Sequence, residues 1–406
     1  ARPPVSRSMP PLAVYLSATA PTQIYTLSLH DALPISILLP VILLFAVALV
    51  APAHADEQLV PLPGQPPEIA WPTQSWPTAS TPAVLEQILD RTITGTDPGT
   101  PQNTRAILVV KGGQLIAERY GEGFDANTRL QSWSMAKSVV HALIGILIKD
   151  GQVDLYQPAR VARWNRKVND SRKAITVENL LRMESGLTFS EDYTNPETSN
   201  VLKMHFGKGR LDTAEYAAGG LLQADPGTLW QYSSGTSNVL SGVIRDTIGA
   251  KSAEEYRAFM EESLFSRIGI RSAIPEFDEA NTFIGSSYLH MTGRDWARFG
   301  LLYLRDGVWD GKRILPEHWA DHARLPTPNS KGQYGAHFWL NGTDPETGQA
   351  VITDEIPTDT FMARGFGAQV VVIIPSLDMV VVYMGLTYDD AGPVVQAITD
   401  IINAAM

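Results

Sequence analysis

The chain has 406 residues, of which 44% are hydrophobic and 18% charged, and its formal net charge is −11. This balance is typical of an ordinary globular protein, and the lack of a basic cluster argues against a nucleic-acid partner because phosphate contacts need a positive surface. The sequence contains no cysteine, which excludes disulfides, thiolate metal sites and a cysteine nucleophile.

Residues 37–55 have the features of a signal peptide. Residues 37–50 are almost wholly apolar, as in a signal-peptide h-region, and Ala53-His54-Ala55 resembles a signal-peptidase site. A transmembrane anchor is the alternative, but the apolar run is short for a bilayer span and contains Pro40. We therefore expect an exported protein, periplasmic or secreted, that begins near Asp56 and keeps no stable membrane span after cleavage.

Residues 1–36 lack the basic region that normally opens a signal peptide, since Arg2 and Arg7 are their only Lys or Arg residues. Residues 22–36 resemble the conceptual translation of sequencing-adapter read-through. We expect residues 1–36 to be a non-native, artefactual leader without functional weight.

Residues 56–83 are rich in Pro and Thr, which favours an extended tether or a strap on the surface of the folded unit. That unit is predicted to span residues 84–406. It opens with a helical pattern near residue 85. The apolar run 106–110 and the segment 115–120 then flank Gly112-Gly113 and predict a strand hairpin. Residues 134–149 form a strongly apolar pattern that predicts a central, buried helix.

Residues 150–290 alternate short helical patterns with polar loops. Helix starts are indicated at Thr176, at Ser252 with Glu255 and, just beyond, at Thr292; Pro316 predicts a further start. Two strand patterns, 369–375 and 379–384, and an amphipathic helix then close the chain. We predict an α+β fold, in which one antiparallel sheet built from both termini is flanked by helices and a mainly helical lobe comprises about residues 150–290.

Ser134 and Lys137 form a Ser-x-x-Lys pair at the start of the predicted buried helix. Residues three apart lie on one helix face, and the helix N-terminus favours a developing negative charge near the serine. A lysine acts as a base only when its pKa falls, and the apolar residues that follow Lys137 provide the burial that lowers it. The pair therefore predicts a serine nucleophile with a lysine base.

A tyrosine often completes such a site by moving protons between the serine, the lysine and the leaving group. Tyr193 and Tyr232 are the candidates downstream, and we choose Tyr232, which lies in Tyr232-Ser233-Ser234 just before a helical pattern. Tyr193 lies in a polar loop, where it either lines the site or is an ordinary loop aromatic.

Four segments occur in the order typical of the serine β-lactamase and penicillin-binding-protein superfamily: Ser134-Met135-Ala136-Lys137-Ser138, residues 179–187, the stretch from Pro226-Gly227 to Tyr232-Ser233-Ser234, and Gly365-Phe366-Gly367-Ala368-Gln369. The chain resembles the class C-like branch of that superfamily, and most of all its 6-aminohexanoate-dimer hydrolases and related carboxylesterases. The likeness covers about residues 84–404 and implies a β-lactamase/DD-peptidase-like fold.

The resemblance also implies roles for residues. Ser134 would attack a carbonyl, while Lys137 and Tyr232 relay the proton and an acyl-enzyme is then hydrolysed. The N–H groups of Ser134 and Phe366 would form the oxyanion hole, and the substrate-binding residues would be Tyr193, Ser234 and Gly365. No cofactor or metal is implied, and the partner is a small-molecule ester or amide substrate.

Two departures narrow the expected substrate. Ser234 stands where lactamases usually have asparagine, and the chain has no Lys-Thr-Gly strand motif for a β-lactam carboxylate. Arg364 could supply a cation there, but we expect a solvated arginine at a strand end. Esters or short linear amides are therefore the preferred substrates. The alternatives are a β-lactamase, a D-alanyl-D-alanine carboxypeptidase, or a non-catalytic sensor that keeps its acyl group.

Other hydrolase classes fit less well. An α/β-hydrolase needs a Gly-x-Ser-x-Gly elbow, which is absent. His318 and His322 are four residues apart, but without the glutamate of a His-Glu-x-x-His zinc site we expect them on a solvated helix face. His141 lies in an apolar run and is expected to be a core histidine with satisfied hydrogen bonds.

Overall fold

The computed structural model describes residues 59–96, 99–388 and 390–406. The leader predicted at residues 1–36 and the signal peptide predicted at 37–55 lie outside these ranges. Within them, no helix combines the length and apolar character needed to span a membrane.

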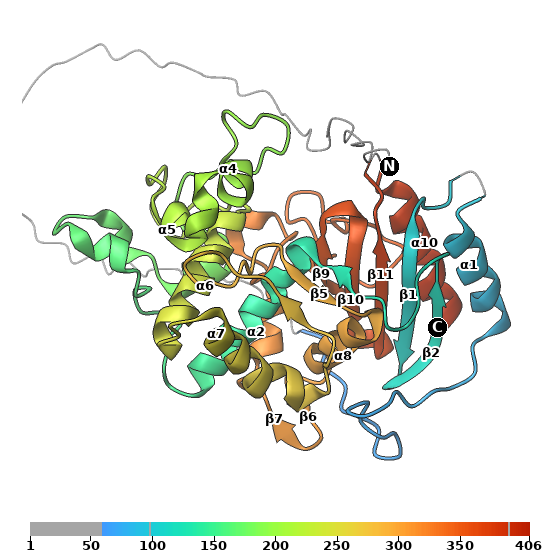
Figure 1. The fold of residues 1–406 in the computed structure, drawn as a ribbon. Coiled ribbons are helices and arrows are strands. Elements are labelled where there is room, and N and C mark those ends of the chain that lie inside the picture. The colour runs from blue at the N-terminus through green and yellow to red at the C-terminus, as the bar shows by residue number, and fades with distance from the viewer. Residues whose placement is uncertain (1–58, 97–98, 389) are drawn as a thin grey trace, which may run out of the picture.

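Strands from the two ends of the chain meet in the middle of a six-stranded antiparallel sheet, as predicted (Figure 1). Its order is β2-β1-β11-β10-β9-β8, and Val109 of β1 pairs with Val381 of β11. The Gly112-Gly113 hairpin is confirmed, and both glycines adopt positive φ angles of 58° and 77°. The strands are β1 (Thr104–Lys111), β2 (Gln114–Tyr120), β8 (Trp339–Leu340), β9 (Phe361–Gly365), β10 (Gln369–Ile374) and β11 (Met379–Gly385).

Helices cover both faces of this sheet, which explains why its inner strands are apolar at nearly every position. On one face, α1 (Ala83–Thr94) and α10 (Gly392–Ala405) pack against residues such as Val109. On the other face, α8 (Gly293–Leu304) packs against β10 and β11. A Cβ atom on Gly300 of α8 would lie 2.7 Å from a Val380 side-chain carbon, so this helix approaches the sheet too closely for a larger residue.

The middle of the chain forms the helical lobe, visible at the left of Figure 1. The predicted caps are confirmed: Thr176, Ser252 and Thr292 each accept a hydrogen bond from the backbone N–H three residues later. The helices are α3 (Val177–Leu181), α4 (Asn200–Phe206), α5 (Thr213–Ala218), α6 (Ser234–Ile248) and α7 (Ala253–Met260), and a small sheet is made of β3 (Leu130–Gln131), β5 (Leu289–Met291) and β4 (Ile274–Pro275).

One predicted helix start is wrong. Pro316 was predicted to open a helix, but helix α9 (Trp319–Arg324) begins only at Trp319. His318, just before it, has a positive φ of 61°, which is incompatible with a helix that runs on from Pro316. The hairpin before it is made of β6 (Val308–Trp309) and β7 (Lys312–Arg313).

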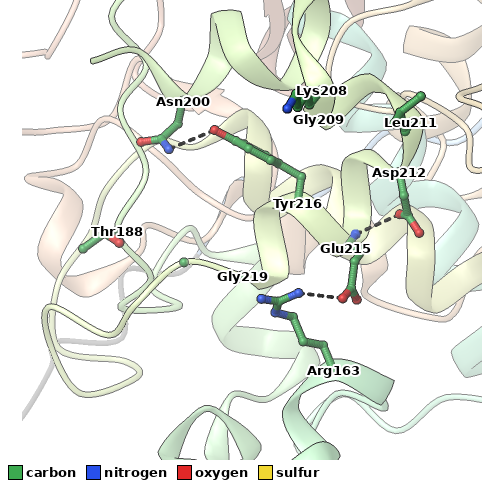
Figure 2. A pocket seen from close by; sticks show the side chains of 11 residues that line it. Arg163, Thr188, Asn200, Lys208, Gly209, Leu211, Asp212, Glu215, Tyr216 and Gly219 are labelled. Carbon is green, nitrogen blue, oxygen red and sulfur yellow. Dashed lines mark hydrogen bonds and ion pairs between the residues drawn. The ribbon is translucent and has the colours of Figure 1, made fainter. Parts of the chain in front are cut away.

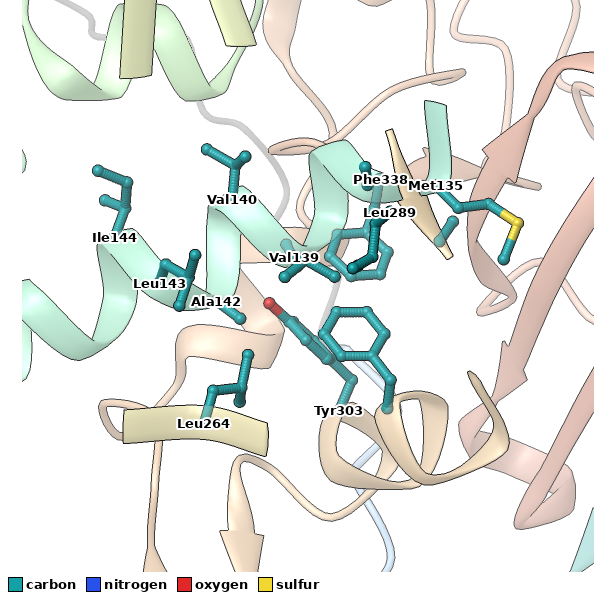
Figure 3. Close-up of a cluster of buried hydrophobic side chains, with 14 of the residues drawn as sticks. Met135, Val139, Val140, Ala142, Leu143, Ile144, Leu264, Leu289, Tyr303 and Phe338 are labelled. Carbon is teal, nitrogen blue, oxygen red and sulfur yellow. The ribbon is translucent and has the colours of Figure 1, made fainter. Parts of the chain in front are cut away.

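Helix α2 (Ala136–Lys149) is the buried helix at the centre of the molecule (Figure 3). Every residue from Ala136 to Leu147 is buried, and Figure 3 shows side chains from α2 among those of Leu264, Leu289, Tyr303 and Phe338. This packing holds the first turn of α2 rigidly, which fixes the position of Lys137.

Residues 59–82 run along the surface of the domain before α1. The Trp71 ring lies 5.0 Å from the Trp309 ring, and the carbonyl of Pro72 accepts a hydrogen bond from Arg298 Nε at 2.7 Å. Trp76 is buried. These contacts attach the Pro/Thr-rich segment to α8 and to the β6–β7 hairpin.

Candidate active site

Ser134 lies in a short 3-10 turn, Trp133–Met135, that leads directly into α2. Trp133 has a φ of 47°, a left-handed conformation that is costly for a residue with a bulky side chain. The turn leaves Ser134 partly exposed, while Met135 and the residues after it are buried. A hydroxyl group is thus presented to solvent at the N-terminal end of a buried helix.

Lys137 is 1% exposed, and its ammonium group contacts three oxygens. Nζ lies 3.0 Å from Ser134 Oγ, 3.1 Å from Ser234 Oγ and 2.9 Å from the carbonyl oxygen of Ser286. Burial lowers the pKa of Lys137 to about 8, although the negative charge of Glu191 opposes this shift. The structure therefore joins the predicted serine and lysine in one hydrogen-bonded pair.

Tyr232 and Ser234 reach the same place from the N-terminus of α6. Ser233 caps this helix by accepting a hydrogen bond from Thr236 N, so Tyr232 lies just outside the helix and Ser234 in its first turn. The Tyr232 ring centre is 4.9 Å from Lys137 Nζ. Burial raises the pKa of Tyr232 well above its usual range, while a hydrogen bond with the Ser134 side chain opposes the shift.

Glu191 is a site residue that the sequence analysis missed. Its Oε1 accepts hydrogen bonds from Ser234 N at 2.8 Å and from Ser234 Oγ at 2.6 Å, and its buried Oε2 has no partner within the described part of the chain. Burial raises the pKa of Glu191, and the charge of Lys137 opposes that shift. A signal was present, because Glu191 is two residues from Tyr193 in the same polar loop.

The end of β9 lies against the turn that carries Ser134. A Cβ atom on Gly365 would lie only 2.3 Å from the carbonyl oxygen of Ser132, so no other residue fits there without displacing the backbone. The Phe366 ring lies 5.5 Å from the Trp133 ring in an edge-on contact. The segments that contain Ser134 and Phe366, the two predicted oxyanion-hole residues, are therefore neighbours.

Aromatic side chains lie around Ser134, Lys137 and Tyr232. The Tyr193 ring stacks on Phe366 at 5.9 Å, so this loop tyrosine lies at the site. Burial raises the pKa of Tyr193, and Glu191 and Tyr232 raise it further. The Trp339 ring lies 5.2 Å from the Tyr232 ring. These rings give the site a largely aromatic border.

Two expectations about charged side chains are corrected. Arg364 is not a solvated arginine: its guanidinium lies 5.3 Å from the centre of the Trp339 ring, and burial lowers its pKa. His322 does not lie on a solvated face, because its Nε2 bonds Glu178 at 2.7 Å and its Nδ1 bonds His141 at 3.1 Å. Only His318, whose side chain is 75% exposed, is solvated as expected.

His141 is a satisfied core histidine, as predicted. Its second ring nitrogen, Nδ1, bonds the Tyr303 hydroxyl at 2.7 Å. Within the described ranges, no group of three or more His, Cys, Asp or Glu side chains is arranged to hold a metal ion.

A cavity of about 490 Å³ opens elsewhere, in the helical lobe between α4 and α5 (Figure 2). Its lining includes an ion pair between Arg163 and Glu215 and a hydrogen bond between Asn200 and the Tyr216 hydroxyl. None of the predicted site residues lines it. Four of its polar side chains, Arg163, Glu215, Asn200 and Tyr216, are thus already paired with one another.

Comparisons with known proteins agree with this geometry. The chain is 27% identical to the 6-aminohexanoate-dimer hydrolase of Paenarthrobacter ureafaciens over 282 residues, which cover 64% of this chain and 67% of that protein. Among solved structures, the "Putative 6-aminohexanoate-dimer hydrolase from Bacillus anthracis" has a TM-score of 0.63 and 22% identity, with 85% of this chain and 89% of that chain covered.

A second solved structure, "EstCE1, a hydrolase with promiscuous acyltransferase activity", has a TM-score of 0.61 at 15% identity and covers 79% of this chain and 98% of that chain. At these identities, both structural likenesses establish the fold alone. The Beta-lactamase family model matches residues 103–404, which include every residue assembled above, and the chain therefore belongs to the Beta-lactamase family.

Proposed function

We propose that this hydrolase of the β-lactamase fold cleaves esters or short linear amides through an acyl-enzyme on Ser134. The observation that carries the proposal is the contact between Lys137 Nζ and Ser134 Oγ, 3.0 Å apart, in a place where burial lowers the lysine pKa to about 8. A lysine with that pKa is partly neutral near physiological pH, so it can accept the proton that the serine hydroxyl must lose.

The reaction begins when neutral Lys137 takes the proton from Ser134 Oγ, which attacks the substrate carbonyl carbon. The carbonyl π electrons move to oxygen, and the N–H groups of Ser134 and Phe366 stabilise that oxyanion. As the oxyanion collapses, the bond to the leaving group breaks, and Tyr232 gives its proton to the departing oxygen or nitrogen and is reprotonated from Lys137. Water then attacks the acyl-enzyme by the same steps and releases the acid.

Three observations support esters and linear amides as substrates. The curated relative is called a 6-aminohexanoate-dimer hydrolase, and one structural neighbour is described as a hydrolase with acyltransferase activity. The aromatic rings of Tyr193, Phe366, Tyr232 and Trp339 suit an apolar substrate chain. The chain contains no Lys-Thr-Gly motif, and β9, where the family position is expected within residues 360–365, reads Phe361-Met362-Ala363-Arg364-Gly365, which disfavours efficient β-lactam turnover.

The experiment is a steady-state assay of the mature protein with 4-nitrophenyl esters, 6-aminohexanoate linear dimer and nitrocefin. Ser134→Ala is expected to abolish turnover of every substrate without changing the melting temperature. Ser138→Ala is the matched control, since its hydroxyl lies one turn along α2 and binds His337 O. Turnover that survives in Ser134→Ala would refute the proposal. A stoichiometric burst without turnover would favour an acyl-binding sensor instead.

We also propose that the protein is exported, on the strength of the signal-peptide features of residues 37–55. Expression from the natural start, followed by mass spectrometry of the N-terminal peptide, is expected to find a chain that begins near Asp56. An uncleaved chain retained in the cytoplasm would contradict export.

A further inference from the structure

Neutral Lys137 has two N–H hydrogens and one lone pair, and its oxygen contacts decide where the lone pair points. Nζ lies 2.9 Å from the carbonyl oxygen of Ser286, which can only accept a hydrogen bond. It lies 3.1 Å from Ser234 Oγ, whose own hydrogen is donated to Glu191 Oε1 at 2.6 Å. Both oxygens therefore take a hydrogen from Nζ. The lone pair is left facing Ser134 Oγ at 3.0 Å, which is the orientation that a base for this serine requires.

Ser286 reaches Lys137 through its backbone, so another group must hold that backbone in place. Ser286 N donates a hydrogen bond to Asn238 Oδ1 at 3.1 Å. Asn238 lies in α6, one turn after Ser234, and both residues are fully buried. One helix therefore carries two of the groups that orient Lys137. Ser234 contacts Nζ directly, and Asn238 holds the residue whose carbonyl contacts Nζ.

The stability of the fold does not account for an asparagine at this position. Asparagine is a weak helix former, and burying an amide is costly unless its donors and acceptor are satisfied. Among the residues that the structure describes, the only other hydrogen bond of the Asn238 side chain runs from Nδ2 to the Met204 sulfur at 3.4 Å, and a thioether is a weak acceptor. Leucine has nearly the same shape and would avoid that cost, but it could not accept a hydrogen bond from Ser286 N.

We propose that Asn238 is a positioning residue for the base of the proposed reaction. By holding Ser286 N, it keeps the Ser286 carbonyl on Lys137 and the lone pair of Lys137 on Ser134. Asn238 makes no hydrogen bond to Lys137 or Ser134 within the described ranges, so it acts through Ser286. This inference rests on the proposed function and deepens it by naming a residue that controls proton removal without contacting the substrate.

The test compares Asn238→Leu, which removes the acceptor, with Asn238→Asp, which keeps an oxygen in its place. The measured quantity is the high-pH plateau of kcat/KM for phenyl acetate, taken from the pH profile of each variant, so a shift in the pKa of Lys137 does not enter the comparison. The plateau is expected to fall about tenfold or more in Asn238→Leu. It is expected to stay within about threefold of wild type in Asn238→Asp, because a carboxyl oxygen accepts from Ser286 N in either protonation state. A merely structural role would lower the melting temperature without this rescue.

Ser237→Ala is the matched control. Ser237 precedes Asn238 in α6, is equally buried and bonds His337 Nε2 at 2.9 Å, but in the described structure it makes no hydrogen bond to the groups around Lys137. Its plateau is expected to stay within about threefold of wild type. Asn238→Ala removes the acceptor without adding apolar bulk, and it keeps the test available should Asn238→Leu not fold; the same fall is expected.

A crystal structure of the less active variant completes the test, and the Ser286 carbonyl is expected to have moved out of hydrogen-bonding distance of Lys137 Nζ. An unchanged contact there would overturn the inference. So would a plateau that is kept when the acceptor is removed, an equal loss in Asn238→Asp, or a comparable loss in Ser237→Ala. Failure of the proposed function is distinguishable, because it would appear as ester turnover that survives in Ser134→Ala.

Discussion

Replacing Glu191 with glutamine tests whether this carboxylate sets the working pH of Lys137. With a lysine pKa of about 8, about 9% of Lys137 is neutral at pH 7 and about 91% at pH 9. If neutral Lys137 is the base, kcat/KM for a small ester rises about tenfold between these pH values. The charge of Glu191 raises the pKa of Lys137, so removing that charge lowers it.

The Glu191→Gln profile is therefore expected to reach half of its plateau at a lower pH than wild type. The ratio of kcat/KM at pH 7 to the plateau value is expected to be higher in Glu191→Gln than in wild type. The increase is at most about elevenfold, since the neutral fraction of Lys137 cannot exceed one. The plateau itself is expected to stay within a few-fold of wild type, because a glutamine oxygen can still accept the bonds from Ser234 N and Ser234 Oγ.

Initial rates of phenyl acetate hydrolysis between pH 6 and 10, corrected for spontaneous hydrolysis, measure the shift. Glu184→Gln is the control, since Glu184 is a buried carboxylate bound by Asn329 and is not among the charges that affect Lys137. A midpoint that does not move in Glu191→Gln, or that moves to higher pH, would refute the assignment of Lys137 as the base.

Three further predictions follow from the same contacts. Lys137→Met is expected to be inactive yet more stable, by up to ~3 kcal/mol below pH 8, since the folded pKa of about 8 lies below the reference value of 10.5. Between pH 8 and 10.5, Lys137 is protonated in the unfolded chain but neutral in the folded protein, so the free energy of unfolding of the wild type rises with pH in this range. The stability difference between Lys137→Met and wild type therefore shrinks as the pH rises. Urea unfolding in which this difference does not shrink contradicts the burial of the Lys137 charge. Gly365→Ala places a Cβ atom 2.3 Å from Ser132 O and is expected to lower both the melting temperature and kcat, the latter at least tenfold. Full activity in this variant would show that β9 can move away from the turn that carries Ser134. Tyr232→Phe is expected to reduce kcat for amides more than for activated esters, whose leaving groups need less protonation, and an equal loss on both would argue against its role as proton donor.

The fold was predictable because its main signals are local. Apolar runs next to Gly112-Gly113 and near the C-terminus predicted the strands, and the need to pair them predicted one sheet from both ends of the chain. The helix that begins near Ser134 was equally clear, since nearly all of its residues are apolar. The start of α9 was not, because the positive φ of His318 has no signal in its neighbours.

The site was only partly predictable. Spacing placed Lys137 beside Ser134, the residues around Tyr232 placed it just before a second helix, and only the family resemblance indicated that the two meet. The contact of Glu191 with Ser234 depends on how a long loop folds back, which spacing does not encode. The same holds for the backbone carbonyl of Ser286, since any residue type presents such an oxygen.

The most direct test of the nucleophile is to label the protein with a fluorophosphonate, which phosphonylates activated serines, and to map the modified peptide by mass spectrometry. Stoichiometric modification of Ser134 is expected, with loss of esterase activity in proportion to labelling and no labelling of Ser134→Ala. Modification of another serine, or an esterase activity that persists after Ser134 is fully labelled, would contradict Ser134 as the residue that carries the acyl group.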